Sequence, residues 1–408
     1  WIKPSPMPRN ANRRYVTDFE MAVWAVKSGG KWTFNKKPNI SYMRPSYSGT
    51  PPQGNNRIHP TQKSESLINE IIETHSNIGD VIFDPFSGSG QISYSANNLN
   101  RFYIASEIDI TYWQKSVKRI KDSYVKPAFN HLGNKFRMIE DLMREFPKKN
   151  IDYFVDVFAG SGIVSLTYKS PKKIILNDND SWLAKILEYL LNTDKEILLK
   201  EFEKIISEYN LPKVKKTYSI EYNKLKKQFN VDKKISKLLV LIIFGFNQQI
   251  RFNKNGNFNI PSGKFWWNDY HKSKLVNFID NAKDKKITIR SNDFVTFIKD
   301  IKKEIEKEKT LFYFDPPYFL SNATYNGSWS DVKEIELIKC LQDLTDQGYK
   351  WFLSNLLKSK NKENKYLDDF IEKNKDKIDV IYLDKINYKN SNYQRKERNY
   401  EDIEVLVR

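Results

Sequence analysis

The pattern in the sequence best suited to chemistry is Asp-Pro-Pro-Tyr, at residues 315–318. It follows the apolar run Leu-Phe-Tyr-Phe, so we expect Asp315 just beyond the end of a buried strand. Pro316 and Pro317 lack backbone N–H donors and fix the chain, which leaves the Asp315 carboxylate and the Pro316 carbonyl as acceptors for one exocyclic amino group. Such acceptors would direct the nitrogen lone pair toward a sulfonium methyl group, with Tyr318 as a stacking face and without a metal. The alternative is an ordinary proline turn with a buried tyrosine.

Two further patterns place an acid and a glycine-rich turn after an apolar run, at 79–90 and 152–166. Each is followed by a second apolar run that ends in acids, at 101–109 and 172–180. A glycine turn after a strand lets the backbone approach a ligand, and an acid at the end of the next strand can bind ribose hydroxyls.

The acids come in pairs, Asp84 with Glu107 and Asp156 with Asp178. These pairs favour a cofactor of the adenosine type over glycine turns that serve packing alone. No Gly-x4-Gly-Lys-Ser/Thr pattern is present, so the sequence does not support a nucleoside triphosphate site.

The repeated pattern of strand, glycine turn and helix predicts two doubly wound α/β domains, with a boundary near residues 126–129. The first 50 residues are rich in Pro, Asn, Ser and Arg and are expected to be dominated by loops. Residues 185–208 and 220–246 are helical in pattern and predict an inserted helical subdomain, followed by a hairpin that turns at Asn255 and Gly256. The other expected elements are helices at 65–75 and 111–124 and strands at 311–314, 351–355, 379–386 and 399–407, the last of which is expected to close the sheet.

The composition indicates the class of partner. Among 408 residues, 68 Lys and Arg stand against 50 Asp and Glu, and this formal charge of +18 favours a nucleic acid over an anionic membrane surface. One cysteine and four histidines exclude a disulfide scaffold and give no zinc-ligand spacing, which is typical of an intracellular protein. The chain begins at Trp1, which suggests a fragment or a trimmed product.

From residue 127 to 408 the motifs resemble, in order, those of the Dam-type (α-class) adenine-specific DNA methyltransferases of restriction–modification systems. The motifs are His-Leu-Gly-Asn-Lys at 131–135, Val-Phe-Ala-Gly-Ser-Gly at 157–162, Leu-Asn-Asp-Asn-Asp at 176–180, Ser-Asn-Asp-Phe at 291–294 and the Asp-Pro-Pro-Tyr motif. The segment 246–264 is similar to that family's DNA-contacting hairpin.

This resemblance implies methyl transfer from S-adenosyl-L-methionine to adenine N6 in duplex DNA, on a base flipped out of the helix. It implies catalytic residues Asp315, Pro316, Pro317 and Tyr318. It implies cofactor contacts from His131, Gly133, Lys135, Asp156, Phe158, Gly160, Gly162, Asp178 and Asp293, and DNA contacts from Asn247, Arg251, Lys254, Asn257 and Lys264.

Residues 1–125 resemble a different branch, the β-class DNA amino-methyltransferases, whose motifs are permuted. The similarity rests on Arg-Ile-His-Pro-Thr-Gln-Lys at 57–63, Asp-Pro-Phe-Ser-Gly-Ser-Gly at 84–90 and Glu-Ile-Asp at 107–109. In that branch the catalytic tetrapeptide lies upstream of these motifs, and none occurs here before residue 84. We therefore expect this part to bind cofactor without catalysing. The implied cofactor residues are Asp84, Phe86, Gly88, Gly90 and Glu107.

The sequence as a whole is interpreted as α/β, with two doubly wound Rossmann-like methyltransferase domains. They are a partial β-class domain at 1–125 and an α-class domain at 126–408, whose DNA-recognition insertion lies at about 183–270. The expected partners are double-stranded DNA and a cognate restriction endonuclease that shares the recognition site, with no membrane and no metal. The expected location is the bacterial cytoplasm, at the nucleoid when bound to DNA. The alternatives are methylation of cytosine N4 or RNA, and a cofactor-binding DNA-recognition protein without turnover.

Overall fold

The computed structural model describes residues 1–3, 13, 15, 17–54, 57–129, 134–214, 217–320, 329–359, 362–383 and 402–408. The chain divides into two compact units. The first unit comprises Trp1–Tyr124 and Phe146–Lys149, and the second comprises Val125–Glu145 and Asn150–Arg408.

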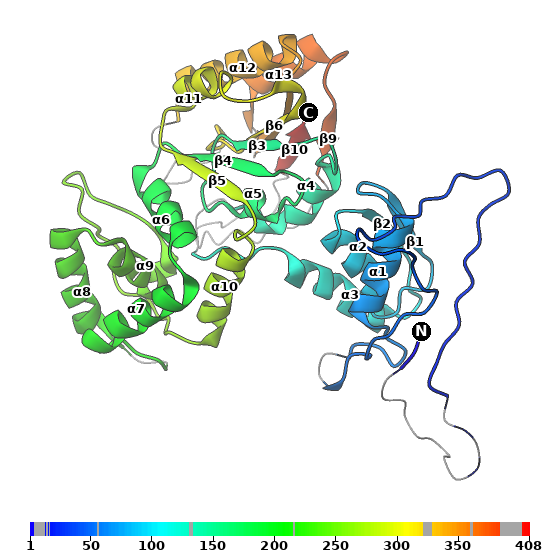
Figure 1. Ribbon diagram of the computed structural model, residues 1–408. Coiled ribbons are helices and arrows are strands. Elements are labelled where there is room, and N and C mark those ends of the chain that lie inside the picture. The colour runs from blue at the N-terminus through cyan, green and yellow to red at the C-terminus, as the bar shows by residue number, and fades with distance from the viewer. Residues whose placement is uncertain are drawn as a thin grey trace. The chain divides into compact units, whose positions relative to one another are not determined.

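The first unit contains a two-stranded parallel sheet of β1 (Val81–Asp84) and β2 (Phe102–Ala105) (Figure 1). Its helices are α1 (Glu65–His75), α2 (Gln91–Asn98) and α3 (Ile110–Ser123). Helices α1 and α2 pack together through Ile68, Ile72 and Ala96, and Ile82 of β1 lies against this core. Side chains alternate between the faces of a strand, so Phe83 points the other way and is 66% exposed.

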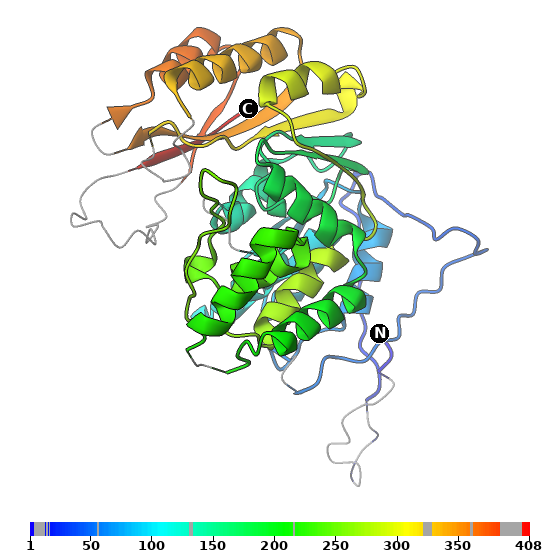
Figure 2. The ribbon, with the colours of Figure 1, turned by 90° about the vertical axis from the view of Figure 1, so that its left-hand side faces the viewer.

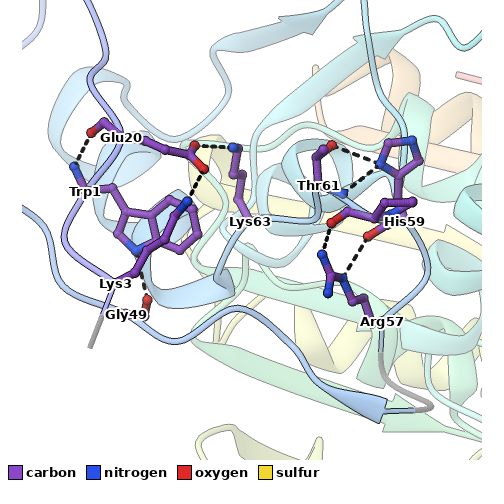
Figure 3. A network of polar contacts seen from close by, with 9 residues as sticks. Trp1, Lys3, Glu20, Gly49, Arg57, His59, Thr61 and Lys63 are labelled. Atoms are coloured by element: carbon purple, nitrogen blue, oxygen red, sulfur yellow. Dashed lines mark hydrogen bonds and ion pairs between the residues drawn. The ribbon is translucent and has the colours of Figure 1, made fainter. Parts of the chain in front are cut away.

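Residues 17–54 have no regular helix or strand, so the expectation of a loop-dominated N-terminal region is confirmed for the described residues. Polar contacts attach this region to the rest of the first unit (Figure 3). The indole nitrogen of Trp1 donates to the carbonyl of Gly49 at 2.8 Å. Lys3 and Lys63 both contact the Glu20 carboxylate, and they lower the pKa of that group.

The second unit is built on one eight-stranded sheet with the order β5-β4-β3-β6-β7-β10-β9, and β8 pairs with β7 off this path. The strands are β3 (Tyr153–Asp156), β4 (Lys173–Asn177), β5 (Lys286–Arg290), β6 (Thr310–Phe314), β7 (Lys350–Ser359), β8 (Lys362–Glu363), β9 (Val380–Tyr382) and β10 (Ile403–Val407). Strands β5, β4, β3, β6 and β7 are parallel, and β10 is antiparallel to both β7 and β9. The prediction that the last strand closes the sheet is wrong, because β9 forms that edge and β10 lies inside it.

Helices cover both faces of this sheet (Figure 1). Helices α11 (Phe294–Ile301), α12 (Asp331–Asp346) and α13 (Lys365–Asn374) lie on one face, where Phe297, Leu341 and Phe370 pack against Val155 and Phe312 of the sheet. On the other face lie α4 (Ile139–Glu145) and α5 (Ile163–Thr167). The second unit is therefore a mixed α/β fold with a central sheet, whose middle strands β3 and β6 are largely buried.

A group of helices follows β4 in the chain and is drawn in green in Figure 2. It comprises α6 (Ser181–Asn192), α7 (Lys195–Glu208), α8 (Ser219–Asp232), α9 (Ile235–Phe244) and α10 (Asp269–Asp280). The predicted helical segments 185–208 and 220–246 are each broken into two helices. Asp194 caps a new helix by accepting from the N–H of Glu196 at 2.8 Å, and Lys233 ends α8 at a positive φ of 55°.

The segment from 246 to 267 forms a compact loop held by two isolated antiparallel bridges, Gly245 with Ser262 and Phe252 with Phe258, rather than a regular ladder. The side-chain oxygen of Asn253 accepts from the backbone N–H of Asn257 at 3.0 Å. The backbone N–H of Asn253 donates to the Asn257 carbonyl at 2.8 Å. The turn at Asn255 and Gly256 forms as predicted, but side-chain bonds replace most of the expected strand pairing.

Candidate active site

The three acids singled out in the second unit follow three neighbouring strands. Asp156 ends β3, Asp178 comes directly after β4, and Asp315 directly after β6. Strand β3 lies between the other two and is parallel to both, so the three carboxyl groups meet at one edge of the sheet. This carboxyl edge is where open parallel α/β sheets bind their ligands.

Asp156 is the most deeply buried of these acids, with 1% of its surface exposed. The Ser165 hydroxyl donates to its Oδ2 at 2.5 Å, whereas Oδ1 has no hydrogen-bond partner among the described residues. Burial, helped by the nearby Asp315 and Asp178 and opposed by Ser165, raises the pKa of Asp156 to about 7. A buried acceptor that lacks a partner is costly, and it points to a ligand group at this position.

The glycine turn after β3 is bonded to the acid after β4. The backbone N–H of Gly160 donates to Asp178 Oδ2 at 2.9 Å, and the N–H of Asp180 donates to Oδ1 at 2.9 Å. Burial raises the pKa of Asp178 to about 6, although these two N–H groups oppose the rise. Gly162 has a φ of 73°, which L side chains rarely adopt, and a Cβ there would stand 3.3 Å from Leu187.

Aromatic side chains lie beside this turn. Phe158 packs at 5.3 Å from Phe294 and 5.7 Å from Trp329, measured between ring centroids. Asp293 caps α11 by accepting from the N–H of Val295 at 3.1 Å. Its other oxygen accepts from Lys333 Nζ at 2.9 Å. Phe294 belongs to the predicted Ser-Asn-Asp-Phe motif but was not named as a site residue, and Trp329 was not singled out from the sequence.

Around Asp315 the structure brings together four side chains from three parts of the chain. Lys135, in the short helix η2 (Lys135–Arg137), places its Nζ 2.6 Å from Asp315 Oδ1 and 4.7 Å from the centroid of the Tyr318 ring. The Tyr318 hydroxyl donates to Glu404 of β10. Burial, helped by Glu404 and opposed by Lys135, raises the pKa of Asp315 to about 6. Burial also raises the pKa of Glu404.

The two prolines of the Asp-Pro-Pro-Tyr motif also lie at this edge. Pro316 is buried and Pro317 half-buried, directly after Asp315 and before Tyr318. His131 and Gly133 lie outside the described residues. Among the described residues, no group of three His, Cys, Asp or Glu side chains is placed to hold a metal ion. No helix in the described part of the chain is long and apolar enough to cross a membrane.

The first unit repeats the contact between glycine turn and acid. The N–H of Gly88 donates to Glu107 Oε2 at 2.6 Å. Burial raises the pKa of Asp84, while the N–H of Phe86, at 3.3 Å from Asp84 Oδ1, opposes that rise. Gly90 has a φ of 67°, and a Cβ there would stand 2.5 Å from Ser116, so no other residue fits without a shift.

The acid and the phenylalanine near the glycine turn are more exposed in the first unit than in the second. The N–H groups of Asp109 and Gly88 lower the pKa of Glu107, whereas burial raises that of its counterpart Asp178. The Phe86 side chain is 89% exposed, while Phe158, its counterpart, packs within an aromatic cluster. The glycine–acid contact is thus alike in the two units, and its surroundings differ.

The predicted DNA-contacting residues lie on or beside the loop after α9. Asn247, Arg251, Lys254 and Lys264 are exposed. Arg251 Nε donates to Asn259 Oδ1 at 2.8 Å. Asn257 is half-buried and accepts from Lys233 Nζ at 3.1 Å, so the loop is tied to the end of α8.

Comparison with known proteins identifies two matching families. The sequence profile of the D12 class N6 adenine-specific DNA methyltransferases matches residues 131–383, and a DNA methylase profile for the N6 and N4 enzymes matches residues 1–118.

The similar proteins include the type II methyltransferase M.FokI of Planomicrobium okeanokoites. It is 31% identical over 290 residues, which cover 67% of this chain and 43% of the relative. Modification methylase StsI of Streptococcus sanguinis is 28% identical over 288 residues, or 69% of this chain and 42% of the relative. The chain thus spans less than half the length of these curated relatives. A solved structure, that of the M1.HpyAVI–SAM complex, is 46% identical over 29% of this chain and 59% of its own, with a TM-score of 0.28.

Proposed function

Because the chain belongs to the D12 class N6 adenine-specific DNA methyltransferases, we propose that its second unit methylates adenine N6 in duplex DNA, using S-adenosylmethionine. The observation that carries the proposal is the position of Asp315. This carboxyl group and Pro-Pro-Tyr follow the strand next to the one that bears the glycine turn. Cofactor and target amine would therefore meet at one edge of the sheet.

The residues present fit this cofactor. The Asp178 carboxylate, held by the N–H of Gly160, has lone pairs left for ribose hydroxyls. Asp156 Oδ1, buried and without a partner among the described residues, would accept from a donor group of the ligand. Phe158 and Phe294 offer apolar faces near the segment that carries Asp293, where the cofactor adenine would lie.

S-adenosylmethionine supplies an electrophilic methyl group, and its transfer leaves the bonding electron pair on sulfur. The Asp315 carboxylate and the Pro316 carbonyl accept the hydrogens of the target amine, which keeps the nitrogen lone pair free for the new N–C bond. The proton that the nitrogen gives up passes to the Asp315 carboxylate. Tyr318 stacks on the base after it leaves the duplex. The Lys135 ammonium contacts Asp315 Oδ1 in the free protein, so an amine that takes this oxygen would displace Lys135 from it.

We assign DNA recognition to about residues 183–270, which include α6 to α9 and the loop that carries Arg251 and Lys254. Exposed basic side chains bind the phosphate backbone and orient the duplex. The proposed contacts from Asn247, Asn257 and Lys264 belong to the same loop segment.

For the first unit we propose a second cofactor site, formed by Asp84, Gly88 and Glu107, without catalysis of its own. The support is the bond from the Gly88 N–H to Glu107, which matches the Gly160–Asp178 bond of the second unit. We place the domain boundary near residue 126, so that each Rossmann-like domain carries one glycine turn.

The modification methylases similar to this chain suggest its biological setting. We propose that it protects the sites of a cognate restriction endonuclease, in the bacterial cytoplasm and at the nucleoid. Its partner would be double-stranded DNA with a short recognition sequence.

The test is methyl transfer from radiolabelled S-adenosylmethionine to unmethylated duplex DNA by the whole chain, followed by digestion to nucleosides. We expect N6-methyladenine with the wild type, none with Asp315→Ala, and an unchanged yield with Asp343→Ala, which removes an exposed carboxylate of α12. Label on cytosine N4 would contradict the choice of adenine. Binding of DNA without any transfer would instead favour a recognition protein.

A further inference from the structure

Glu404 lies in the last strand, beyond the residues that the adenine methyltransferase profile matches. It pairs with Leu356 of β7, next to an irregularity between Ile403 and Glu404. Its neighbours on the strand, Val405 to Val407, are completely buried. Glu404 itself is half-buried, and partial burial of an acid in an otherwise apolar strand is costly unless its surroundings compensate for the charge.

The compensation comes from the active site. The Tyr318 hydroxyl donates to Glu404 Oε1, and Lys135 Nζ stands 4.7 Å from the centroid of the same tyrosine ring. Lys135 Nζ is also 2.6 Å from Asp315 Oδ1. The four side chains therefore form a continuous series from Glu404 through Tyr318 and Lys135 to Asp315.

This series holds two acids and one ammonium group. In the free protein the Lys135 ammonium is paired with Oδ1 of Asp315, the carboxylate on which the proposed target amine would also lie. If a buried lysine loses its carboxylate partner, its positive charge is left uncompensated, which strongly destabilises the protein unless another acceptor is near. Lys135 lowers the pKa of Glu404 as well as that of Asp315, so its charge is felt by both acids.

We propose that Glu404 is a positioning residue for methyl transfer. It fixes the Tyr318 ring through the hydroxyl, and it is the acceptor toward which Lys135 turns when the target amine occupies Asp315. The inference rests on the proposed adenine methylation and adds a residue to it from the last strand of the sheet.

Two variants separate the two parts of this role. Glu404→Gln keeps an oxygen that accepts from Tyr318 but removes the negative charge. Glu404→Ala removes both. We expect kcat to fall about 10- to 100-fold in Glu404→Ala, since small displacements of a positioning group have effects of this size. In Glu404→Gln we expect a smaller fall in kcat, with a similar KM for DNA. Asp379→Asn is the control, because it removes an acid that directly precedes β9, away from the carboxyl edge, and pairs with Arg408 outside the site.

The pH profile gives a readout that a merely structural role would not change. Among the described residues, the titratable groups that act on Asp315 and Glu404 are Lys135 of η2, Asp156 of β3, Tyr313 of β6, Tyr318 after β6 and Asp402 before β10. Glu404 raises the pKa of Asp315, so loss of its charge should move the acid limb of kcat/KM to lower pH in Glu404→Gln. The limb of Asp379→Asn should stay at the wild-type value.

The outcomes separate this inference from the function on which it rests. If the wild type does not methylate adenine, the proposed function is overturned and the role of Glu404 falls with it. If the wild type methylates adenine and Glu404→Ala does so at the same rate, only the positioning role is overturned. An acid limb in Glu404→Gln at the wild-type pH also overturns it, whatever the rate. A slower Glu404→Ala together with a shifted limb in Glu404→Gln supports it.

Discussion

Replacement of Asp156 by Asn should stabilise the second unit at neutral pH while it weakens the site. Asp156 is completely buried, and burial raises its pKa from 3.8 to about 7. In this pH interval the folded protein holds a proton that the unfolded chain has lost. The free energy of unfolding therefore falls as the pH rises through this interval, because the carboxyl group must ionise while buried. Above the interval this loss of stability no longer changes with pH. The shift of about 3 pH units corresponds to a cost of about 4 kcal/mol at pH 8, as an upper limit.

Asn cannot ionise, and its side-chain oxygen can still accept from Ser165. The free energy of unfolding of Asp156→Asn should thus exceed that of the wild type at pH 8, and the excess should shrink by about 2 kcal/mol at pH 5.5. The assay is urea unfolding of both proteins at the two pH values. Asp152→Asn, at the start of the same strand, reports the effect of removing a carboxylate that contacts Lys172 and Lys309 near the surface. An excess that is the same at pH 5.5 and pH 8 would refute the reasoning, because Asp156 would then be ionised in the folded protein.

Four other results are expected. Asp178→Ala should weaken S-adenosylmethionine binding at least tenfold by calorimetry, since it removes the acceptor held by Gly160, and equal affinity would contradict the assigned role. Arg251→Ala should weaken binding to DNA of any sequence and reduce the salt dependence by about one counterion, unlike the exposed Lys339→Ala of α12. Glu107→Ala should reduce the cofactor bound per chain from two molecules to one, and a wild type that binds one would exclude the site in the first unit. Binding of the cationic cofactor should release protons near pH 6 to 7, because it favours ionised forms of acids whose pKa values are raised to about 6 and 7, and calorimetry in two buffers of different ionisation enthalpy measures that release.

The sequence was sufficient to predict the parts of the site that are local. An acid and a glycine turn after an apolar run signal the end of a parallel strand, and this pattern located Asp156, Asp178 and Asp315 at the ends of β3, β4 and β6. The prolines of Asp-Pro-Pro-Tyr correctly predicted that the strand ends before them, as β6 does at Phe314. These features depend on backbone rules that act over a few residues, so they can be read from the chain alone.

Other features depend on contacts between distant parts of the chain. Glu404 lies 86 residues from Tyr318, and the two meet because β10 inserts between β7 and β9. The helical pattern of 185–208 and 220–246 is continuous, but Asp194 forms a cap and Lys233 adopts a positive φ within it. The apolar periodicity does not reveal these helix ends, because tertiary packing decides whether a helix stops at such a residue or continues through it.

Comparison of the two units indicates which parts of the site can be separated. In the second unit β3 has β4 on one side and β6 on the other, so the acid that holds the glycine turn and the Asp-Pro-Pro-Tyr segment lie at the same edge. In the first unit β1 has β2 on one side, and within the described residues no strand lies on the other. The Gly88–Glu107 bond forms all the same, at 2.6 Å against 2.9 Å for Gly160–Asp178. The contact proposed to hold the cofactor therefore needs only one strand, helix and strand unit, whereas the proposed transfer also needs the neighbouring strand that precedes Asp315.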